Sequence, residues 1–278
     1  MNAHVQSQAF AAAHEDGIAP GEVLLSVNNV SLSFGGVKAI TDISFDIRKG
    51  EIRAIIGPNG AGKTSMLNVI NGFYTPQQGT ILFRGVERRA MKPHHAVRQG
   101  IARTFQNVAL FKGMSTLDNI MAGRSTLMKR NIGWQMLWHG PALAEEIEHR
   151  KVVEEIIDFL EITAYRHLPV GMLPYGIQKR VELGRALAMD PRLLLLDEPV
   201  AGMNSEETED MARFLVDIRS ELGIPMVLVE HDMGLVMDLA DRVLAMDFGR
   251  PLATGRPEEI QIHPDVIRAY LGTVEEDA

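Results

Sequence analysis

The chain lacks features that would place it in several classes of protein. Its 278 residues include no cysteine, which excludes a disulfide scaffold or a thiolate-held metal cluster and suits a reducing compartment. No apolar run approaches the roughly 20 residues that span a bilayer, so we expect any connection to a membrane to come through partners. The net charge is −8, without a dense stripe of Lys and Arg. The composition therefore argues against a protein that binds nucleic acid by neutralising phosphates.

The two ends of the sequence give little sign of folded structure. Residues 1–20 lack the basic start and apolar run of a signal peptide, and we expect them to form a flexible tail. We expect a second, short tail at residues 273–278. No self-similar period recurs along the chain, which indicates a single unit rather than a repeat array. Because 46% of the residues are apolar, the chain between the tails can bury a sizeable core.

One loop is the most informative segment of the sequence. It reads Gly57-Pro58-Asn59-Gly60-Ala61-Gly62-Lys63-Thr64 and is followed by Ser65. Its glycines let successive backbone N–H groups point inward and form a nest that a polyphosphate can fill. Residues 51–56 before it are typical of a buried strand, and residues 64–72 after it are typical of a helix whose positive N-terminal end faces the phosphates. This context predicts a nucleoside triphosphate site and disfavours an ordinary Gly-rich turn.

Within that loop, two side chains have distinct expected tasks. Lys63 should reach the β- and γ-phosphates as a point charge, and the hydroxyl of Thr64 should ligate Mg²⁺. The expected ligands are therefore a nucleoside triphosphate, which the resemblance given below makes ATP, and Mg²⁺.

The order of strand and helix signals predicts an α/β protein. Residues 22–56 alternate as strands do, with one face apolar and the other polar, as in Ile43, Phe45 and Ile47 against Ser44, Asp46 and Arg48. Helical signals dominate residues 116–165, where Pro141 can start a long helix. The remaining expected strands are 80–84, 101–105, 192–197, 225–230 and 241–247, and the remaining expected helices are 93–100, 178–189, 205–222, 232–239 and 264–272. This alternation predicts a mostly parallel core sheet with an N-terminal antiparallel β part and a helical subdomain inserted at about residues 107–178.

A pair of adjacent carboxylates completes the expected phosphate site. Asp197 and Glu198 end the apolar run 193–196. Two like charges at the end of such a strand repel and lose solvation unless a cation or a proton transfer uses them. We expect Asp197 to carry Mg²⁺ directly or through water, and Glu198 to act as the general base that polarises the attacking water. A surface turn that happens to read Asp-Glu-Pro is the alternative, which the phosphate loop upstream disfavours.

The order of these motifs resembles the ATP-binding subunit of ABC transporters over about residues 22–272, and we place the P-loop NTPase domain of that type at residues 21–272. The resemblance implies that Phe34 stacks on adenine, that Gln106 touches Mg²⁺ or the attacking water, and that His231 contacts the γ-phosphate. Without the resemblance, Phe34 would more often lie in a core and His231 would more often be an ordinary turn residue. Lys63, Gln106, Glu198 and His231 are thus the expected catalytic group.

A second loop departs from the pattern of that family. The family usually has Leu-Ser-Gly-Gly-Gln at a loop that faces the ATP of the neighbouring subunit, whereas this chain has Leu173-Pro174-Tyr175-Gly176-Ile177. Pro174 offers neither a hydroxyl nor an N–H, although its fixed φ suits the start of a helix. One lost hydrogen bond to a charged group would weaken the contact by roughly 1.5–3 kcal/mol. Tyr175 and Gly176 remain the expected contacts to that nucleotide.

The variant loop and residues 255–272 resemble the branch that serves branched-chain and related amino-acid importers. The resemblance implies a second ATPase subunit, with a heterodimer favoured over a homodimer, two transmembrane permeases, an indirect periplasmic binding protein and no nucleic acid. It also implies a peripheral place on the cytoplasmic face of the inner membrane. Amides, urea or aromatic acids are other possible substrates. Alternative functions are ATPase of another transporter, such as a lipopolysaccharide exporter, a soluble ABC ATPase in DNA repair or translation, and a regulatory module without turnover.

The apolar residues that follow Gln106 have two possible roles. Val108, Leu110 and Phe111 could line a groove for a helix of the permease, or they could belong to the core.

Overall fold

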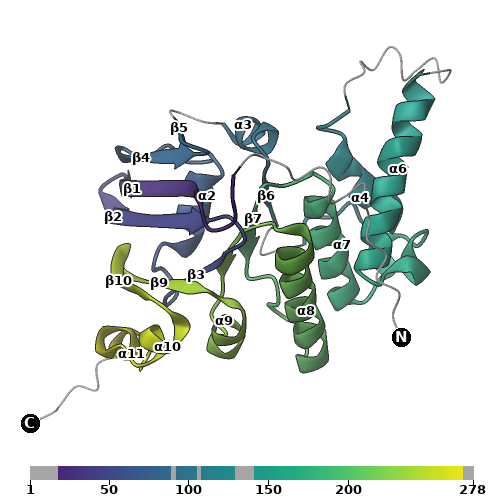
Figure 1. The fold of residues 1–278 in the computed structure, drawn as a ribbon. Coiled ribbons are helices and arrows are strands. Elements are labelled where there is room, and N and C mark those ends of the chain that lie inside the picture. The colour runs from purple at the N-terminus through teal and green to yellow at the C-terminus, as the bar shows by residue number, and fades with distance from the viewer. Residues whose placement is uncertain (1–17, 89–91, 105–107, 129–140, 272–278) are drawn as a thin grey trace, which may run out of the picture.

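A computed structural model describes residues 18–88, 92–104, 108–128 and 141–271. Two sheets form its centre (Figure 1). The antiparallel sheet has the order β2-β1-β4-β5, and its strands are β1 (Val23–Phe34), β2 (Val37–Arg48), β4 (Gln78–Phe83) and β5 (Val86–Glu87). The second sheet has the order β10-β9-β3-β8-β7-β6. Its strands are β3 (Ile52–Ile56), β6 (Ile101–Arg103), β7 (Leu193–Asp197), β8 (Met226–Val229), β9 (Arg242–Asp247) and β10 (Arg250–Gly255).

Helices lie around the second sheet, with the longest ones on the right side of Figure 1 and two short C-terminal ones at its lower left. The described helices in the first 160 residues are α2 (Lys63–Ile70), α3 (Pro93–Arg98), α4 (Thr116–Arg124) and α6 (Pro141–Phe159). Two 3₁₀ turns follow at Thr163–Tyr165 and Val170–Met172. The later helices are α7 (Tyr175–Leu187), α8 (Ser205–Leu222), α9 (Met233–Leu239), α10 (Pro257–Gln261) and α11 (Pro264–Leu271).

Strand β7 explains why the middle of the second sheet is so apolar. Leu193 and Leu195 pack with α2 and the antiparallel sheet, whereas Leu194 and Leu196 pack with α4, α6, α7 and α8. Successive side chains of a strand point to opposite faces, so a strand covered on both faces needs a continuous apolar run. The run 193–196 therefore places Asp197 at the end of a strand that packing holds on both sides.

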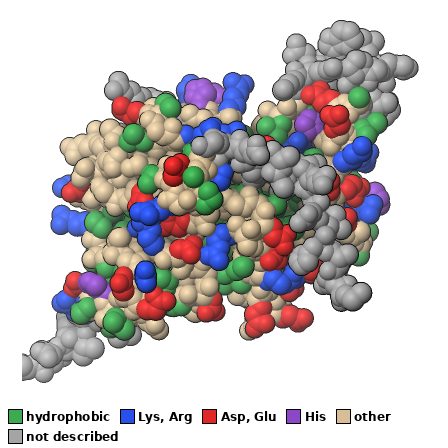
Figure 2. All heavy atoms as spheres, viewed as in Figure 1, with side chains coloured by type: hydrophobic (Ala, Val, Ile, Leu, Met, Phe, Trp, Pro, Cys, Tyr) green, Lys and Arg blue, Asp and Glu red, His purple; other side chains and the backbone are tan. Residues whose placement is uncertain are grey.

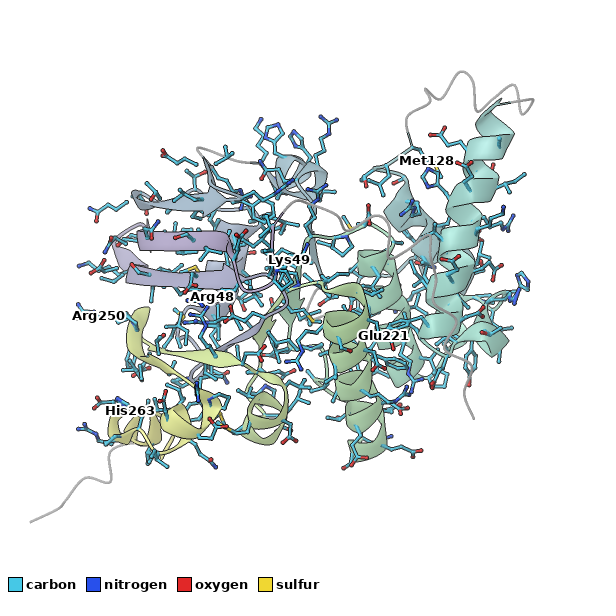
Figure 3. The ribbon with its side chains drawn as sticks, viewed as in Figure 1. Arg48, Lys49, Met128, Glu221, Arg250 and His263 are labelled. Carbon is cyan, nitrogen blue, oxygen red and sulfur yellow. The ribbon has the colours of Figure 1, made fainter. Side chains whose placement is uncertain are left out.

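The two sheets are joined by an ion-pair network. Arg242 of β9 donates to Asp46 of β2 and to Glu51, the residue just before β3, at 2.7–3.0 Å in its four side-chain contacts. These carboxylates raise the pKa of Arg242, chiefly through the hydrogen bonds of Glu51. Arg48 and Lys49 lie beside this network, where β2 ends and the chain turns toward β3 (Figure 3). The network fixes the antiparallel sheet relative to the strand that leads into the phosphate loop.

The expected architecture is confirmed, with differences at the ends of elements. The apolar side of β2, the helix that begins at Pro141 and the parallel strands are where the sequence predicts them. Two expectations differ: the helix expected at 178–189 begins at Tyr175, and the strand expected at 101–105 ends at Arg103, with Phe105 outside the described residues. The antiparallel edge strand β10 was not predicted. The domain boundaries stay a prediction. Residue 178, the expected end of the helical subdomain, lies within α7.

No helix among the described residues is long and apolar enough to cross a membrane. Acidic and basic side chains are interspersed over the face drawn in Figure 2, and a group of basic side chains lies over α3 at its top.

Candidate functional site

The phosphate loop connects β3 to α2, and two of its glycines are dictated by close backbone neighbours. A Cβ on Gly57 would lie 2.1 Å from the carbonyl oxygen of Met246, and one on Gly62 would lie 2.5 Å from that of Ala39. Both residues also have positive φ, 151° and 96°, which disfavours other residues. The sequence therefore uses glycine here because the loop lies directly on β9 and β2, and the same geometry makes the concave backbone that can accept phosphates.

Lys63 begins α2 and folds back over the loop. Its Nζ donates to the carbonyl oxygens of Gly57 at 2.7 Å and Pro58 at 3.1 Å. Burial lowers the pKa of Lys63, while the charges of Glu198 and Asp197 act in the opposite direction. The ammonium therefore lies on the loop, within electrostatic range of the carboxylate pair, and its contact with the terminal phosphates stays a prediction.

A hairpin supports the loop from behind. Gly249, in the turn between β9 and β10, donates its N–H to the carbonyl oxygen of Ala61 at 3.1 Å and accepts from the N–H of Thr41 at 2.7 Å. Phe248 precedes it with a φ of 44° and a side chain that is 84% exposed. Arg250 marks this turn beside the antiparallel sheet in Figure 3. One residue thus connects the phosphate loop, the hairpin and β2.

The oxygens of Asp197 have different partners. Thr64 donates its hydroxyl to Oδ1 at 3.5 Å, and Arg103 donates Nη2 to Oδ2 at 2.7 Å. The side chains of Arg103 and Asp197 are only 6% and 3% exposed. Arg103 was missed by sequence reasoning, although a charged residue in an otherwise apolar edge strand was an available signal.

Glu198 follows Asp197 at a sharp turn. It has a φ of 49°, an unusual value for a residue with a side chain, and its N–H donates to the carbonyl oxygen of Val229 at 2.9 Å. His231 places Nδ1 3.9 Å from Oε1 of Glu198 and is itself well exposed. The structure therefore brings the expected base and the expected γ-phosphate contact together at the ends of neighbouring strands β7 and β8.

A second carboxylate, Glu230, lies beneath this pair and was not predicted. It is fully buried, and it accepts the N–H groups of Val200 at 3.4 Å and His231 at 3.1 Å. Burial raises the pKa of Glu230, while those two hydrogen bonds lower it. Glu230 therefore joins the loop after Glu198 to the loop that carries His231. Its place directly before a predicted site histidine was the only signal in the sequence.

The aromatic residue expected to stack on adenine lies at the end of β1. Phe34 is 44% exposed and meets the ring of Tyr74 edge to face, with centroids 4.8 Å apart. Since nearly half of Phe34 is exposed, it is not a core residue, and its ring can be covered by a flat ligand.

The variant loop leads into α7 as expected, because Pro174 is the N-cap residue and Tyr175 begins the helix. A Cβ on Gly176 would lie 2.3 Å from Oε1 of Glu207. Glu207 cannot easily move, since it forms a capping box with Asn204 at the start of α8. Gly176 is thus a packing position, while Tyr175 is 41% exposed.

Not every predicted residue can be placed. Gln106 lies outside the described residues. Of the apolar residues that follow it, Leu110 packs against the core and Phe111 is 58% exposed, so the core role holds for Leu110 and the groove for a permease helix stays a prediction. Ser65 lies in the first turn of α2, one residue after Thr64.

The site fits a nucleotide-bound divalent cation. Thr64 and Asp197 present two oxygen atoms beside a phosphate cradle, and Mg²⁺ commonly takes one or two protein oxygens together with substrate phosphates. No cluster of three or more potential ligands among His, Asp and Glu occurs in the part of the chain that the structure describes. Phosphate oxygens would therefore have to complete the coordination.

Comparisons with known proteins agree with this geometry. Residues 40–201 match a family model described as ABC transporter, and residues 250–276 match one described as branched-chain amino acid ATP-binding cassette transporter. The chain is 38% identical over 252 residues to the high-affinity branched-chain amino acid transport ATP-binding protein BraF of Pseudomonas aeruginosa, which covers 90% of this chain and 98% of the relative. It is also 38% identical over 253 residues, with the same coverage, to the protein LivG of Escherichia coli, which has the same description.

A solved structure has the same fold. The ADP conformation of an ATP-binding cassette of an ABC transporter superposes with a TM-score of 0.79 at 29% identity, over 90% of this chain and 99% of the other.

Proposed function

Because this chain belongs to the family of ABC transporter ATP-binding subunits, which hydrolyse ATP, we propose that it powers an importer of branched-chain amino acids. The observation that carries the proposal is the similarity along 90% of the chain to two subunits named for this transport. The match of residues 250–276 to the branched-chain family model supports the same substrate class. Related small polar solutes are the alternative substrates.

Within this proposal the phosphate loop binds the polyphosphate and Phe34 covers the adenine. Backbone N–H groups of the loop and the positive end of α2 contact the phosphates, and Lys63 moves from the carbonyls of Gly57 and Pro58 to the terminal phosphates. Thr64 and Asp197 hold Mg²⁺, which neutralises charge on the phosphates when it is bound. Gln106 is proposed as a further contact to the metal or the attacking water.

Glu198 then takes a proton from the water whose oxygen bonds to the γ-phosphorus, while the bond from that phosphorus to the bridging oxygen breaks and ADP leaves, giving inorganic phosphate. Its Oε1 lies 3.9 Å from Nδ1 of His231, so a histidine that contacts the γ-phosphate also lies next to the base. Glu230 fixes the backbone on both sides of this pair through its two hydrogen bonds. The arrangement holds a water acceptor and a phosphate contact side by side, which is what in-line phosphoryl transfer to water requires.

A second ATPase subunit as partner is supported by the separation of the two loops in Figure 1, where α2 lies next to the antiparallel sheet and α7 lies among the helices. We place the start of α7, with Tyr175 and Gly176, against the nucleotide of a second ATPase subunit, with a heterodimer favoured. Opening and closing of the ATPase pair would be transmitted to two permeases at the cytoplasmic face of the membrane. A periplasmic binding protein would deliver the solute to these permeases.

Reconstitution tests the proposal. The chain is combined in proteoliposomes with two permeases, a second ATPase subunit and a binding protein of a branched-chain amino-acid importer. We expect ATP-dependent uptake of radiolabelled leucine and isoleucine in preference to urea and phenylalanine. A complex that hydrolyses ATP but imports only urea or an aromatic acid would overturn the substrate and leave the ATPase role intact. A chain that does not hydrolyse ATP in any such complex would overturn both.

A further inference from the structure

Arg103 lies at the end of the edge strand β6, opposite the carboxylate proposed to hold the metal. It pairs in parallel register with Leu195 of β7, and Asp197 follows two residues later. Since side chains two residues apart share one face of a strand, Arg103 and Asp197 project from the same side of the sheet. The ion pair between them is therefore a consequence of strand register, and a packed sheet holds both partners.

The guanidinium of Arg103 has contacts on two different elements. Nη2 donates to Oδ2 of Asp197 at 2.7 Å, and Nη1 donates to Oδ1 of Asn68 at 2.6 Å. Asn68 lies on α2, one helical turn after Thr64. A guanidinium is planar and its donors have fixed directions, so holding Asn68 also fixes the angle at which Nη2 meets the carboxylate. A lysine could supply the charge but not this geometry.

The contact divides the two oxygens of Asp197. Oδ2 is engaged by Arg103, while Oδ1 faces the hydroxyl of Thr64 at 3.5 Å. Oδ1 and the Thr64 hydroxyl lie together beside the phosphate loop. The orientation of one carboxylate, set by Arg103, thus determines whether two metal ligands can act together.

We propose that Arg103 is a positioning residue for the divalent cation: by holding Oδ2 of Asp197 it directs Oδ1 toward Thr64 and so strengthens metal binding. This inference rests on the proposed function, in which Thr64 and Asp197 hold Mg²⁺ with ATP. The charge of Arg103 alone would have the opposite effect on metal binding, so the two explanations can be separated by experiment. The positive charge of Arg103 repels a cation, so if charge alone mattered, removing Arg103 would tighten metal binding instead of weakening it.

The test measures Mn²⁺ binding directly, without turnover. MnCl₂ is titrated by electron paramagnetic resonance into the full chain saturated with the non-hydrolysable analogue AMP-PNP, and the free-metal signal gives the affinity. We compare the wild type with Arg103→Met, Arg103→Lys, Asp197→Asn and the double variant. Affinity of a fluorescent ATP analogue in EDTA reports nucleotide binding without metal, and circular dichroism reports folding.

We expect Arg103→Met to weaken Mn²⁺ binding by about 10-fold or more, as losses of groups that orient metal ligands do, with little change in nucleotide binding in EDTA. Arg103→Lys should also weaken it, because the charge remains and the geometry does not. Adding Arg103→Met to Asp197→Asn should have no further effect on metal affinity. Asn68→Ala, which removes the acceptor of Nη1 and leaves the contact with Asp197, should have a smaller effect.

Three results separate the possible failures. Unchanged or tighter Mn²⁺ binding in both Arg103 variants, with Asp197→Asn impaired, would overturn the role of Arg103 alone. Equal losses from Arg103→Met in the presence and absence of Asp197 would also overturn it, since the effect would not pass through that carboxylate. Failure of the wild type to bind Mn²⁺ with AMP-PNP would instead overturn the proposed function of the site. If Arg103→Met does not fold, Arg103→Lys decides the question.

Discussion

The site at the C-terminal ends of β3, β7 and β8, which we call the sheet edge, differs in its construction from the start of α7. At the sheet edge, Lys63, Asp197 and Glu230 are each less than 10% exposed, and each has hydrogen-bond partners within the chain. At the start of α7, Tyr175 is 41% exposed, and Pro174 before it is the N-cap residue without a side-chain hydrogen bond. The first region has a geometry fixed by its own chain. The second presents groups to the outside and depends on what covers them.

This difference indicates how work is divided in the proposed dimer. A region whose side chains are fixed in advance can stabilise charge that develops in a reaction without reorganising. A region with exposed groups contributes only when another subunit is bound. We therefore expect substitutions at the sheet edge to change chemistry and substitutions before α7 to change assembly. Four predictions test this contrast.

Glu198→Gln should have the largest effect. It removes the proposed proton acceptor, and loss of a general base typically lowers the rate by about 10²- to 10⁴-fold. ATP hydrolysis in the reconstituted complex should fall accordingly, while binding of a fluorescent ATP analogue is retained. Glu209→Gln, on an exposed acid of α8, is the matched control and should hydrolyse ATP as the wild type does. Unchanged turnover of Glu198→Gln would remove this residue from the role of base.

Gly176→Ala should destabilise the chain by about 1–3 kcal/mol, the usual cost of overpacking. The added Cβ would lie 2.3 Å from Oε1 of Glu207, which the capping box holds in place. Urea denaturation gives the free energy of unfolding. Gly113→Ala is the control, because a Cβ there meets no atom within 4 Å. Equal stability of the two variants would mean that Glu207 moves aside at little cost, and that the capping box does not hold it in place.

Pro174→Ser should strengthen contact with the nucleotide of the second subunit. A hydroxyl and an N–H would return to the loop, and one hydrogen bond to a charged group contributes roughly 1.5–3 kcal/mol, or about 10- to 100-fold in affinity. The dimer is measured by analytical ultracentrifugation of the chain mixed with the second ATPase subunit and ATP. Glu198→Gln is present in this chain to prevent hydrolysis, and the dissociation constant is compared with and without Pro174→Ser. Pro174→Ala restores only the N–H and should give a smaller gain. If neither variant dimerises better, this loop does not contact that nucleotide through residue 174.

Glu230→Gln should have the smallest effect, a change in the pH dependence of the free energy of unfolding. Burial raises the pKa of Glu230 above 4.5 in the folded chain, and the charges nearby include Glu198, His231 and Lys179. The protonated form is favoured by folding, so this stability contribution is complete below about pH 4.5 and is lost as pH rises through the folded-state pKa. Urea denaturation between pH 4.5 and 8 should therefore show a flatter profile for Glu230→Gln. A parallel pair of profiles would contradict the assignment.

The sequence predicted what is local and missed what joins distant segments. The loop 57–64 could be predicted because its glycines, lysine and threonine act within one turn of chain, and β7 because its apolar run is continuous. Arg103 and Asp197 are 94 residues apart, and Val200 and Glu230 are 30 apart. Such contacts depend on strand order and register, which periodicity does not specify. Gly176 was expected at a nucleotide, whereas its nearest constraint is the side chain of Glu207.

The turn between β9 and β10 offers a way to observe this protein at work. Gly249 hydrogen-bonds both the phosphate loop and β2, while the adjacent side chain of Phe248 is 84% exposed. Since the chain has no cysteine, Phe248→Cys would create a single thiol for a fluorescent or spin label. The label would sit outside the nucleotide site yet one residue from a peptide that contacts it, so arrival and loss of ATP could be followed as a change in signal in real time.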